Sequence, residues 1–364
     1  MTGPHLAFHT EAPGWGGAEA CLAALIAGAT AGAGRVSVLA TDAAVLERLM
    51  AAAPAGAAGV LLPTRTHSLD PRPLAAHVGV LHRLRPDLLH VNAAFTFGSP
   101  YALVAALATR TPYVVQEHLP LPPRHPRLQV PVKRLTSGRA REHVAVSARA
   151  ARETETFGGL EPGRVHVVPN GVPPPSAATA PRRVGPEPTV VGVGRLTRQK
   201  GFDLLVAAVA ELPGVRVVLV GDGPEREGLE ALARRTGLGE RLHILGWRSD
   251  ARAWIAGADV LAAPSRFEAA PLVLVEALAE GAPVVSSDVG GAAEALDDGG
   301  CGLLVAPEDV GGLRAAVAAC LADPAATAAR VTRGRARFAA AYTEQAMLAA
   351  WAEIYERAAA RGRR

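Results

Sequence analysis

Cysteine, aromatic residues and long apolar runs are all scarce in this chain, and each shortage excludes a class of protein. Three cysteines among 364 residues, odd in number and far apart, exclude a disulfide framework and a cysteine-based metal site. Aromatic residues make up 4% of the chain, too few to interleave with basic residues on a nucleic-acid-binding surface. The chain begins without the pattern of a signal peptide, and no apolar run reaches the roughly 18 residues of a membrane-spanning helix. We therefore expect a cytoplasmic protein with no nucleic-acid partner.

The composition is that of a globular protein, with 49% hydrophobic and 20% charged residues in a length suited to two domains. The positive charge is concentrated in the N-terminal half, because residues 1–180 hold 16 Lys and Arg against 11 Asp and Glu, whereas the remainder holds 22 against 23. Most of this excess lies in RHPRLQVPVKRLTSGRAR, from Arg124 to Arg141. This run predicts either a solvated face or a peripheral contact with anionic lipid at the inner membrane face.

Short apolar segments alternate with helical patterns along the chain, which is typical of parallel sheets covered by helices. In the first half, we expect strands near His5–His9, Arg35–Ala40, Gly59–Leu62, Asp87–Val91, Pro112–Gln116, His143–Ser147 and Arg164–Val168. In the second half, we expect them near Thr189–Gly194, Val215–Gly221, Leu242–Gly246, Asp259–Ala263, Pro283–Ser286 and Gly302–Val305. Between the two series, Pro173–Pro188 contains six prolines in sixteen residues and predicts an interdomain linker.

These patterns predict an α/β fold of two doubly wound, Rossmann-like domains that face each other across a cleft. The expected boundaries are residues 1–172 for the first domain, 173–188 for the linker, 189–342 for the second domain and 343–364 for a C-terminal helix. Ligands of such sheets bind at the carboxyl ends of the strands. We therefore look for the site in the loops that follow strands.

The first candidate site is a pair of glutamates, Glu268 and Glu276, in SRFEAAPLVLVEALAEGAPVV. Glu268 follows a strand and a turn, whereas Glu276 lies in the helical pattern that comes next. An ionised carboxylate accepts two hydroxyl donors at once, which suits the vicinal diols of a sugar or ribose. The alternative is a solvated helix face.

The second candidate is the turn GVGRLTRQKG, in which Arg195 and Lys200 lie between a strand and a helix that opens at Gly201. A guanidinium, an ammonium and the amides of a helix start together suit a phosphate group. The alternative is two exposed bases in a turn. A P-loop is excluded, because the order is Lys-Gly rather than Gly-Lys followed by Ser or Thr.

Two further segments lie in the first half of the chain. Gly16 and Gly17, in GWGGAE, would allow a ligand to approach the backbone closely at a helix start. His118 ends the apolar strand of PYVVQEHLP, where its side chain would face the cleft. The alternatives are glycines that only form a turn and a histidine that only packs.

Together these segments resemble the retaining glycosyltransferases of family 4, which have the two-domain GT-B architecture. The resemblance extends over nearly the whole chain, through GWGGAE, VVQEH, VVPNGV, VGVGRLTRQKGFD, LVGDGPER, ILGW and ADVLAAPSRFEAAPLVLVEALAEGAPVVSSDVGG. It implies transfer of a hexose-type sugar from a nucleoside-diphosphate sugar, with UDP preferred and GDP possible, to a hydroxyl acceptor. The nucleotide sugar is a substrate, so no cofactor is expected, and no metal is expected either.

The resemblance also implies residue roles. Arg195 and Lys200 match the residues that bind the donor diphosphate, Glu276 matches the ribose ligand, and Glu268 matches a sugar contact. His118 would lie beside the sugar, so the expected catalytic set is Arg195, Lys200, Glu268 and His118. The remaining expected donor contacts are backbone groups and small residues, namely Gly16, Gly17, Gly246, Ala269, Ala270, Pro271 and Leu272. The C-terminal helix would cross back to the first domain, and donor binding would close the two domains.

Ala269 and Ala270 depart from the family, since many relatives have Gly and Phe or Leu after the first glutamate. This departure leaves the donor sugar open, and the acceptor stays open among a small molecule, a glycan and a lipid-linked intermediate. Two other classes of function also stay open. One is a nucleotide-sugar epimerase or hydrolase of the same architecture, and the other is a noncatalytic nucleotide-sugar or glycan-binding protein.

Overall fold

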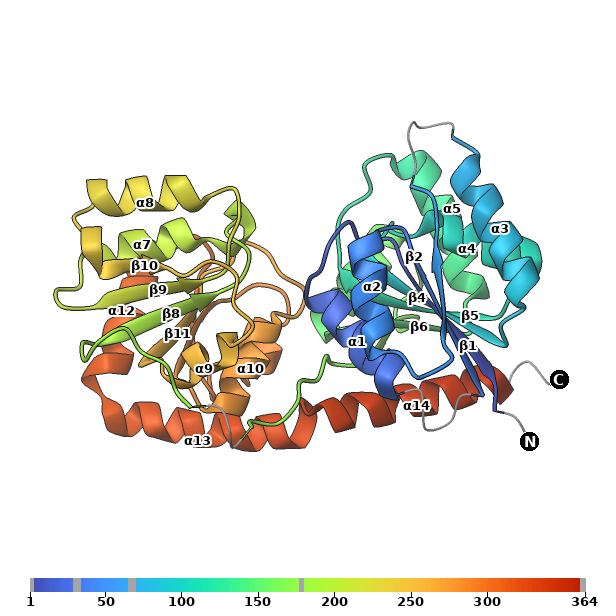
Figure 1. Cartoon of the computed structure of the whole chain (residues 1–364). Coiled ribbons are helices and arrows are strands. Elements are labelled where there is room, and N and C mark those ends of the chain that lie inside the picture. Colours follow the sequence, from blue (N-terminus) through green and yellow to red (C-terminus); the bar gives the residue numbers. More distant parts are fainter. Residues whose placement is uncertain (1–2, 29–33, 65–69, 177–179, 361–364) are drawn as a thin grey trace. The chain divides into compact units, whose positions relative to one another are not determined.

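The computed structural model describes residues 3–28, 34–64, 70–176 and 180–360. The chain forms two compact units (Figure 1). Unit 1 combines Met1–Asn170 with the C-terminal Glu344–Arg364, and unit 2 is Gly171–Thr343. The expected α/β fold of two doubly wound domains is confirmed, because each unit contains one parallel sheet with helices on both faces.

Unit 1 is built on a seven-stranded parallel sheet with the order β3-β2-β1-β4-β5-β6-β7. Its strands are β1 (His5–Thr10), β2 (Arg35–Ala40), β3 (Ala58–Leu61), β4 (Leu88–Phe95), β5 (Tyr113–Leu119), β6 (Glu142–Ala145) and β7 (His166–Val167). Its helices are α1 (Gly17–Gly28), α2 (Ala43–Ala52), α3 (Arg72–Leu84), α4 (Pro100–Thr109), α5 (Pro126–Arg139), α6 (Ala148–Gly158) and α14 (Glu344–Ala360).

Unit 2 is built on a six-stranded parallel sheet with the order β10-β9-β8-β11-β12-β13. Its strands are β8 (Thr189–Val193), β9 (Arg216–Val220), β10 (Leu242–Ile244), β11 (Val260–Ala263), β12 (Val284–Ser287) and β13 (Leu303–Val305). Its α-helices are α7 (Phe202–Ala210), α8 (Arg226–Arg235), α9 (Ala251–Ala256), α10 (Leu272–Glu280), α11 (Ala292–Ala295), α12 (Val310–Ala322) and α13 (Pro324–Ala341). Two 3-10 turns, η2 (Arg198–Lys200) and η3 (Gly239–Arg241), complete it.

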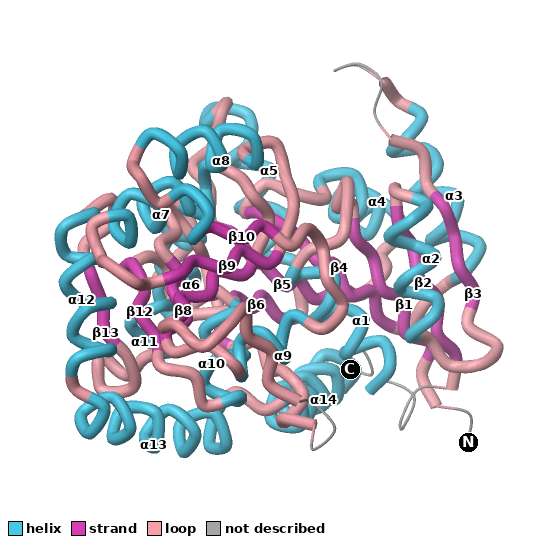
Figure 2. The backbone as a smooth tube through the Cα atoms, turned by 60° about the vertical axis from the view of Figure 1, so that its left-hand side comes forward, coloured by secondary structure: helices cyan, strands magenta, loops and turns pink. Residues whose placement is uncertain are grey.

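Both sheets reverse their strand order next to the first strand of the unit (Figure 2). In unit 1 the reversal lies between β1 and β4, with Leu6 opposite Leu88. In unit 2 it lies between β8 and β11, with Val190 opposite Val260. Helices then leave on opposite faces, and the loops at the carboxyl ends of the two strands separate to form a crevice that ligands use. Ligand-binding residues are therefore expected in the loops that follow β1, β4, β8 and β11.

The sequence pattern predicted each of these strands. Central strands of doubly wound sheets are buried on both faces and are largely apolar, whereas the edge strand β7 is exposed. All six residues of β1 and all four of β11 are buried. The three cysteines are buried and free, so the expectation that they form no disulfide framework is confirmed.

Helix α14 packs against unit 1, although it follows unit 2 in the sequence. Trp351 is almost fully buried, and its ring lies 4.6 Å from the His90 ring on β4. The Tyr355 hydroxyl lies 2.9 Å from His90 Nδ1. A buried aromatic cluster of this kind attaches the last helix firmly to the unit that contains the start of the chain.

The described part of the proline-rich segment is attached to unit 2 and is not a free tether. The Arg182 amide donates to the Ala253 oxygen at 2.8 Å, and the Arg182 side chain pairs with Asp250 at 2.7 Å. Arg183 pairs with Asp259 through both carboxylate oxygens. Proline content removed the periodic signal of a helix or strand, but these two arginines still anchor the segment.

Candidate functional site

The turn after β8 carries the two predicted phosphate-binding bases. Arg195 is exposed, and Lys200 is the last residue of η2. Gly201 follows with φ 65°, and a Cβ atom there would lie 2.1 Å from the backbone oxygen of Pro264. Glycine is therefore required, because it brings this turn against the segment that follows β11. The result is that Lys200 lies beside the loop that contains Glu268.

An arginine that the sequence analysis did not select holds these two segments together. Arg266 donates to both carboxylate oxygens of Asp203, at 2.8 and 2.7 Å, and to the Arg198 backbone oxygen at 2.9 Å. Its own amide donates to the Gln199 oxygen at 2.8 Å. The bidentate guanidinium lowers the pKa of Asp203, so the pair stays charged. In the sequence, Arg266 could not be distinguished from a solvated arginine of a loop.

Lys200 and Glu268 form an ion pair. Lys200 Nζ lies 2.6 Å from Glu268 Oε1, and the Ser265 hydroxyl donates to the same oxygen at 3.0 Å. Both charged side chains are largely removed from solvent. No described residue bonds the second carboxylate oxygen of Glu268. The structure therefore brings two predicted residues into direct contact and leaves one carboxylate oxygen available to a ligand.

Glu276, the second predicted glutamate, lies in the middle of α10. Its burial raises the pKa to about 7, while Arg252 and Lys200 oppose this shift and Glu280 adds to it. Glu280 is itself paired with Arg252 at 2.7 Å. Glu276 is thus a carboxyl group close to half-ionised at neutral pH and within electrostatic reach of Lys200. Such a group changes its charge readily when a ligand approaches.

A short loop, Ala269–Pro271, joins Glu268 to the start of α10. Gly290 has φ 56°, and a Cβ atom there would lie 2.2 Å from the Glu268 backbone oxygen. The Gly291 amide donates to the Ala269 oxygen at 2.7 Å. Ala269 is buried, Ala270 is partly buried and Pro271 caps α10, which begins at Leu272. The first amides of α10 have no partner within the helix and lie in the same loop region as Glu268.

The turn that contains Gly246, an expected donor contact, is held by a short bridge between two glycines. Gly246 has φ 72°, and its oxygen accepts from the Gly221 amide at 2.9 Å. Trp247, the next residue, has a largely exposed side chain. Arg248 is held in place by Asp250, at 2.6 and 2.9 Å. The turn therefore presents an ordered backbone and one aromatic surface.

The predicted residues of the first half lie in unit 1. Gly17 begins α1, and a Cβ atom on Gly16 would lie 3.3 Å from the buried Glu19 carboxylate. His118 lies near the end of β5, with Nε2 at 2.7 Å from Asn92 Oδ1. Burial lowers the pKa of His118 to about 4, so its ring is neutral near pH 7. It can contribute hydrogen bonds or shape, but not positive charge.

The predicted basic run needs one correction. Lys133 is buried on α5, where it pairs with the buried Glu117 carboxylate, and His143 Nε2 lies 2.9 Å from the same oxygen. An unpaired charge in the protein interior is unfavourable. Lys133 and Glu117, which lies on strand β5, avoid this cost by pairing with each other. Lys133 is therefore unavailable to a lipid surface. Within the described part of the chain, no helix has the length and apolarity required to span a bilayer.

Two protein-family models match this chain. Residues 187–323 match the model described as glycosyl transferases group 1, and residues 15–174 match the model of glycosyltransferase family 4. The two matches do not overlap, and together they include well over half of the chain.

Individual relatives agree with these models. The chain is 35% identical over 167 residues to the lipopolysaccharide core biosynthesis glycosyltransferase LpsE of Rhizobium meliloti, a match that covers 46% of this chain and 49% of that protein. It is 36% identical over 221 residues to the glycogen synthase of Mycobacterium tuberculosis, covering 58% of this chain and 52% of that protein. The aligned regions thus span about half the length of these curated relatives.

The fold also matches solved structures. Alr3699/HepE of Anabaena, solved in complex with UDP, superposes with a TM-score of 0.81 over 97% of this chain and 99% of that one, at 24% identity. At this identity the likeness shows a common fold.

Proposed function

The chain belongs to the family 4, group 1 glycosyltransferases of GT-B architecture, and from this premise we propose that it transfers a hexose-type sugar from a nucleoside-diphosphate sugar to a hydroxyl acceptor with retention of anomeric configuration. The observation that supports this best is the ion pair of Lys200 and Glu268. It lies at the carboxyl ends of β8 and β11, where the sheet order reverses and such sheets bind nucleotides.

In the proposed reaction the diphosphate leaves the anomeric carbon while the acceptor oxygen bonds to the same face of that carbon. The bond between the anomeric carbon and the diphosphate oxygen breaks, and the acceptor proton passes to a phosphate oxygen. Negative charge therefore grows on the departing diphosphate. Lys200, Arg195 and the first amides of α10 would stabilise it, and loss of one such donor commonly reduces the rate ~100-fold or more.

The ion pair suits this role, because an ammonium carries three donors and Glu268 uses one of them. Lys200 can bond the diphosphate while it stays bonded to Glu268. Glu268 is held by Lys200 and Ser265 through Oε1, so its other oxygen can accept a sugar hydroxyl. One carboxylate would thus orient both the cation and the sugar.

Glu276 would bind the ribose diol. A carboxylate accepts two hydroxyl donors best when it is ionised. Burial raises the pKa of Glu276, and Arg252 and Lys200 offset part of this effect. The base would lie against the Gly246 turn, through its backbone and the exposed Trp247 ring. Uridine is the preferred base, as in the UDP complex of the Anabaena protein of the same fold, and guanosine is the alternative.

We propose that diphosphate departure requires no metal ion. Lys200 and Arg195 supply positive charge at the position where a bound divalent cation would otherwise supply it. His118 would contact the sugar as a neutral ring, and Gly16 and Gly17 would let the diphosphate approach the start of α1.

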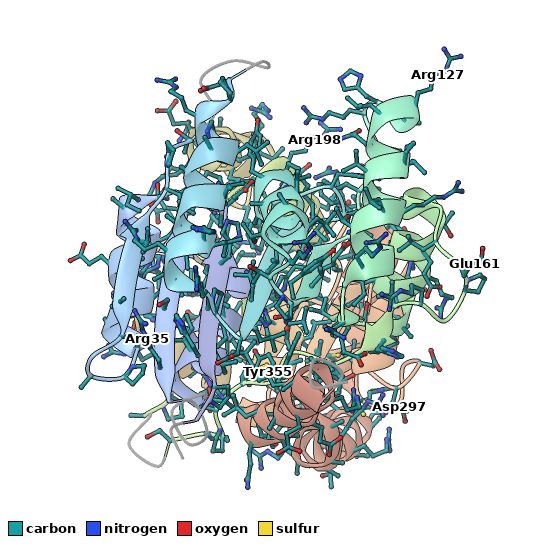
Figure 3. The ribbon with its side chains drawn as sticks, turned by 90° about the vertical axis from the view of Figure 1, so that its right-hand side faces the viewer. Arg35, Arg127, Glu161, Arg198, Asp297 and Tyr355 are labelled. Atoms are coloured by element: carbon teal, nitrogen blue, oxygen red, sulfur yellow. The ribbon has the colours of Figure 1, made fainter. Side chains whose placement is uncertain are left out.

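A membrane-bound acceptor is favoured by the surface of α5. Three apolar side chains share one face of this helix and are 69%, 36% and 53% exposed, namely Leu128, Val132 and Leu135. Arg127, at the first turn of the same helix, points away from the ribbon (Figure 3), and Arg124 is exposed just before it. Apolar and basic residues together are typical of a helix that lies on an anionic membrane surface.

The activity can be tested with a panel of UDP and GDP sugars and the purified chain. A donor that raises the melting temperature identifies the base and sugar, because a ligand at 100 times its dissociation constant stabilises the folded state by ~2.7 kcal/mol. Nucleoside diphosphate release is then measured with candidate acceptors, and the anomeric configuration of the product is determined by NMR. Release of free sugar alone would indicate a hydrolase, and donor binding without any release would indicate a noncatalytic protein.

A further inference from the structure

Two histidines and a glutamate of unit 1 converge at the carboxyl end of β1, outside the residues assigned to the donor. His9 lies near the end of β1, Glu11 follows that strand and His77 lies on α3. His9 Nε2 lies 3.1 Å from His77 Nε2. Glu11 Oε1 lies 3.8 Å from His9 Nε2 and 3.7 Å from His77 Nε2. Three atoms of types that bind transition metals are therefore close neighbours.

These three distances have the size that a single metal ion requires. The circle through the three atoms has a radius of about 2.1 Å. Zinc binds imidazole nitrogen at about 2.0 to 2.1 Å and carboxylate oxygen at about 2.0 to 2.2 Å. One ion can thus reach all three atoms without movement of the backbone.

The two histidine rings face each other through their Nε2 atoms. Their centroids are 5.1 Å apart although their Nε2 atoms are 3.1 Å apart, so the rings converge through their Nε2 edges. His77 Nδ1 lies 2.6 Å from the Pro73 backbone oxygen. A carbonyl oxygen can only accept, so Nδ1 carries the proton and His77 Nε2 presents its lone pair toward His9 and Glu11. A backbone carbonyl in this position is the usual partner of a metal-bound histidine.

Both histidines are buried, so a metal ion between them would be held within the protein interior. Neutral imidazole is the form that binds a metal. Glu11 retains some exposure and supplies the negative charge that partly balances a divalent ion.

Glu11 and His77 also line a cavity within unit 1. The cavity has a volume of about 680 Å³, and its other walls include Tyr101, Arg124 and Gln129. The cavity lies at the reversal of strand order next to β1, where sheets of this kind bind ligands. An ion held by three protein atoms would therefore have its remaining coordination position on a space large enough for water or a ligand oxygen.

We propose that unit 1 binds one divalent transition-metal ion, zinc by preference, through His9 Nε2, His77 Nε2 and the Glu11 carboxylate, with water in the position that faces the cavity. The ion would join β1 to α3. It would be separate from the diphosphate contacts of unit 2, and it does not depend on the proposed transferase activity. Two nitrogens and one oxygen favour zinc over magnesium, which prefers oxygen ligands.

The test uses the full chain without a polyhistidine tag, freed of metal by a chelator. Zinc binding is measured by calorimetry and by the metal content after gel filtration, and unfolding is followed by the melting temperature. We expect one zinc per chain, a higher melting temperature with zinc and no response to magnesium. His77→Ala and Glu11→Gln should each weaken zinc binding at least ~100-fold, since each removes one of three ligands.

A matched control is His82→Gln, because His82 lies exposed on the same helix α3. This variant should bind zinc like the wild type. Glu11→Gln keeps the side-chain volume, so it serves as the decisive variant if His77→Ala unfolds. Zinc binding that survives in Glu11→Gln and His77→Ala would overturn the proposal. So would a folded, metal-free wild type that takes up no zinc, since the two rings would then form only a hydrogen bond to each other.

Discussion

Lys200 Nζ lies 2.6 Å from Glu268 Oε1, although the two residues are 68 positions apart in the sequence. The cation expected to bind the diphosphate is therefore in direct contact with the carboxylate expected to contact the sugar. Their contact makes the positions of both side chains interdependent, and the Arg266 contacts hold the two loops that carry them.

Lys200→Ala and Arg195→Ala should each reduce turnover ~100-fold or more, because each removes positive charge from the departing diphosphate. Initial rates at saturating donor and acceptor measure this effect, with melting curves to verify folding. Arg198→Ala is the matched control, since Arg198 is an exposed base of the same turn and its contact to Arg266 uses the backbone oxygen. If the Lys200 and Arg195 variants behave like the control, their assignment is wrong.

The two glutamates should separate by ligand. Glu276→Gln should weaken the binding of free nucleoside diphosphate about 10-fold or more, which is the equivalent of one charge-assisted hydrogen bond. Glu268→Gln should weaken the binding of the intact nucleotide sugar. It should bind the free nucleoside diphosphate at least as tightly as the wild type, because Lys200 loses its ionic partner. Calorimetry with both ligands measures the two effects. Equal losses for both ligands in both variants would contradict this division.

Glu276 also predicts a pH dependence of nucleotide binding. Burial raises its pKa to about 7 from an ordinary value of 4.5, so the group is protonated in the free protein below pH 7. Ribose binding uses the ionised form, so affinity for the nucleoside diphosphate should fall as the pH is lowered from 8 to 6. Titrations of wild type and Glu276→Gln over this range isolate the glutamate, because ionisation of the ligand is common to both. Parallel pH profiles for the two proteins would reject Glu276 as the cause of the pH dependence.

The same shift predicts a change in folding stability. The folded state binds more protons than the unfolded state between pH 4.5 and about 7, so the Glu276 contribution to stability is present at low pH and is lost as the pH rises through this window. Glu276→Gln should therefore be more stable than wild type at pH 8 by about 1 to 3 kcal/mol and nearly equal to it at pH 4.5. Urea unfolding at the two pH values measures the difference.

Metal removal should leave diphosphate binding unchanged. We expect the dissociation constant of the nucleoside diphosphate to agree within about twofold in chelator and in millimolar magnesium, since fixed cations neutralise the phosphates. A tenfold higher affinity in the presence of magnesium would mean that a metal ion neutralises part of the diphosphate charge. The measurement addresses unit 2 and does not depend on zinc in unit 1.

Binding of α5 to membranes can be measured by flotation with anionic vesicles. The double variant of Leu128→Asp and Leu135→Asp should bind at least ~10-fold more weakly, because it loses two exposed apolar side chains that would enter the bilayer and adds repulsive charge. Leu61→Asp is the control, since Leu61 is an exposed leucine of β3. Equal binding by the double variant and the control would place the contact elsewhere.

Local patterns predicted much of this molecule. Alternating apolar and helical segments identified the strands, most clearly the buried central strands such as β11, which is a continuous apolar run. The sequence also allowed us to select the bases and glycine after β8 and the two glutamates after β11. Ligand-binding residues of such sheets lie in the loops at the carboxyl ends of strands, so they follow a strand closely in the sequence.

Other features could not be predicted, because each depends on residues distant in the sequence. Lys133 appears basic and solvated in a local window, yet a carboxylate on β5 draws it into the interior. Arg266 resembles any loop arginine until the fold places Asp203 opposite it, 63 positions away. The convergence of His9 and His77, 68 positions apart, had no local signal at all.

The sequence by itself determined the two α/β domains and the family, and it identified the bases and carboxylates that we propose as donor contacts. Each of these is encoded in a short stretch of chain. The tertiary structure alone decided which of these groups touch, which charges are paired and where the histidines meet. Those outcomes depend on strand order and register, which bring separate loops to one edge of a sheet and are not written in any single segment.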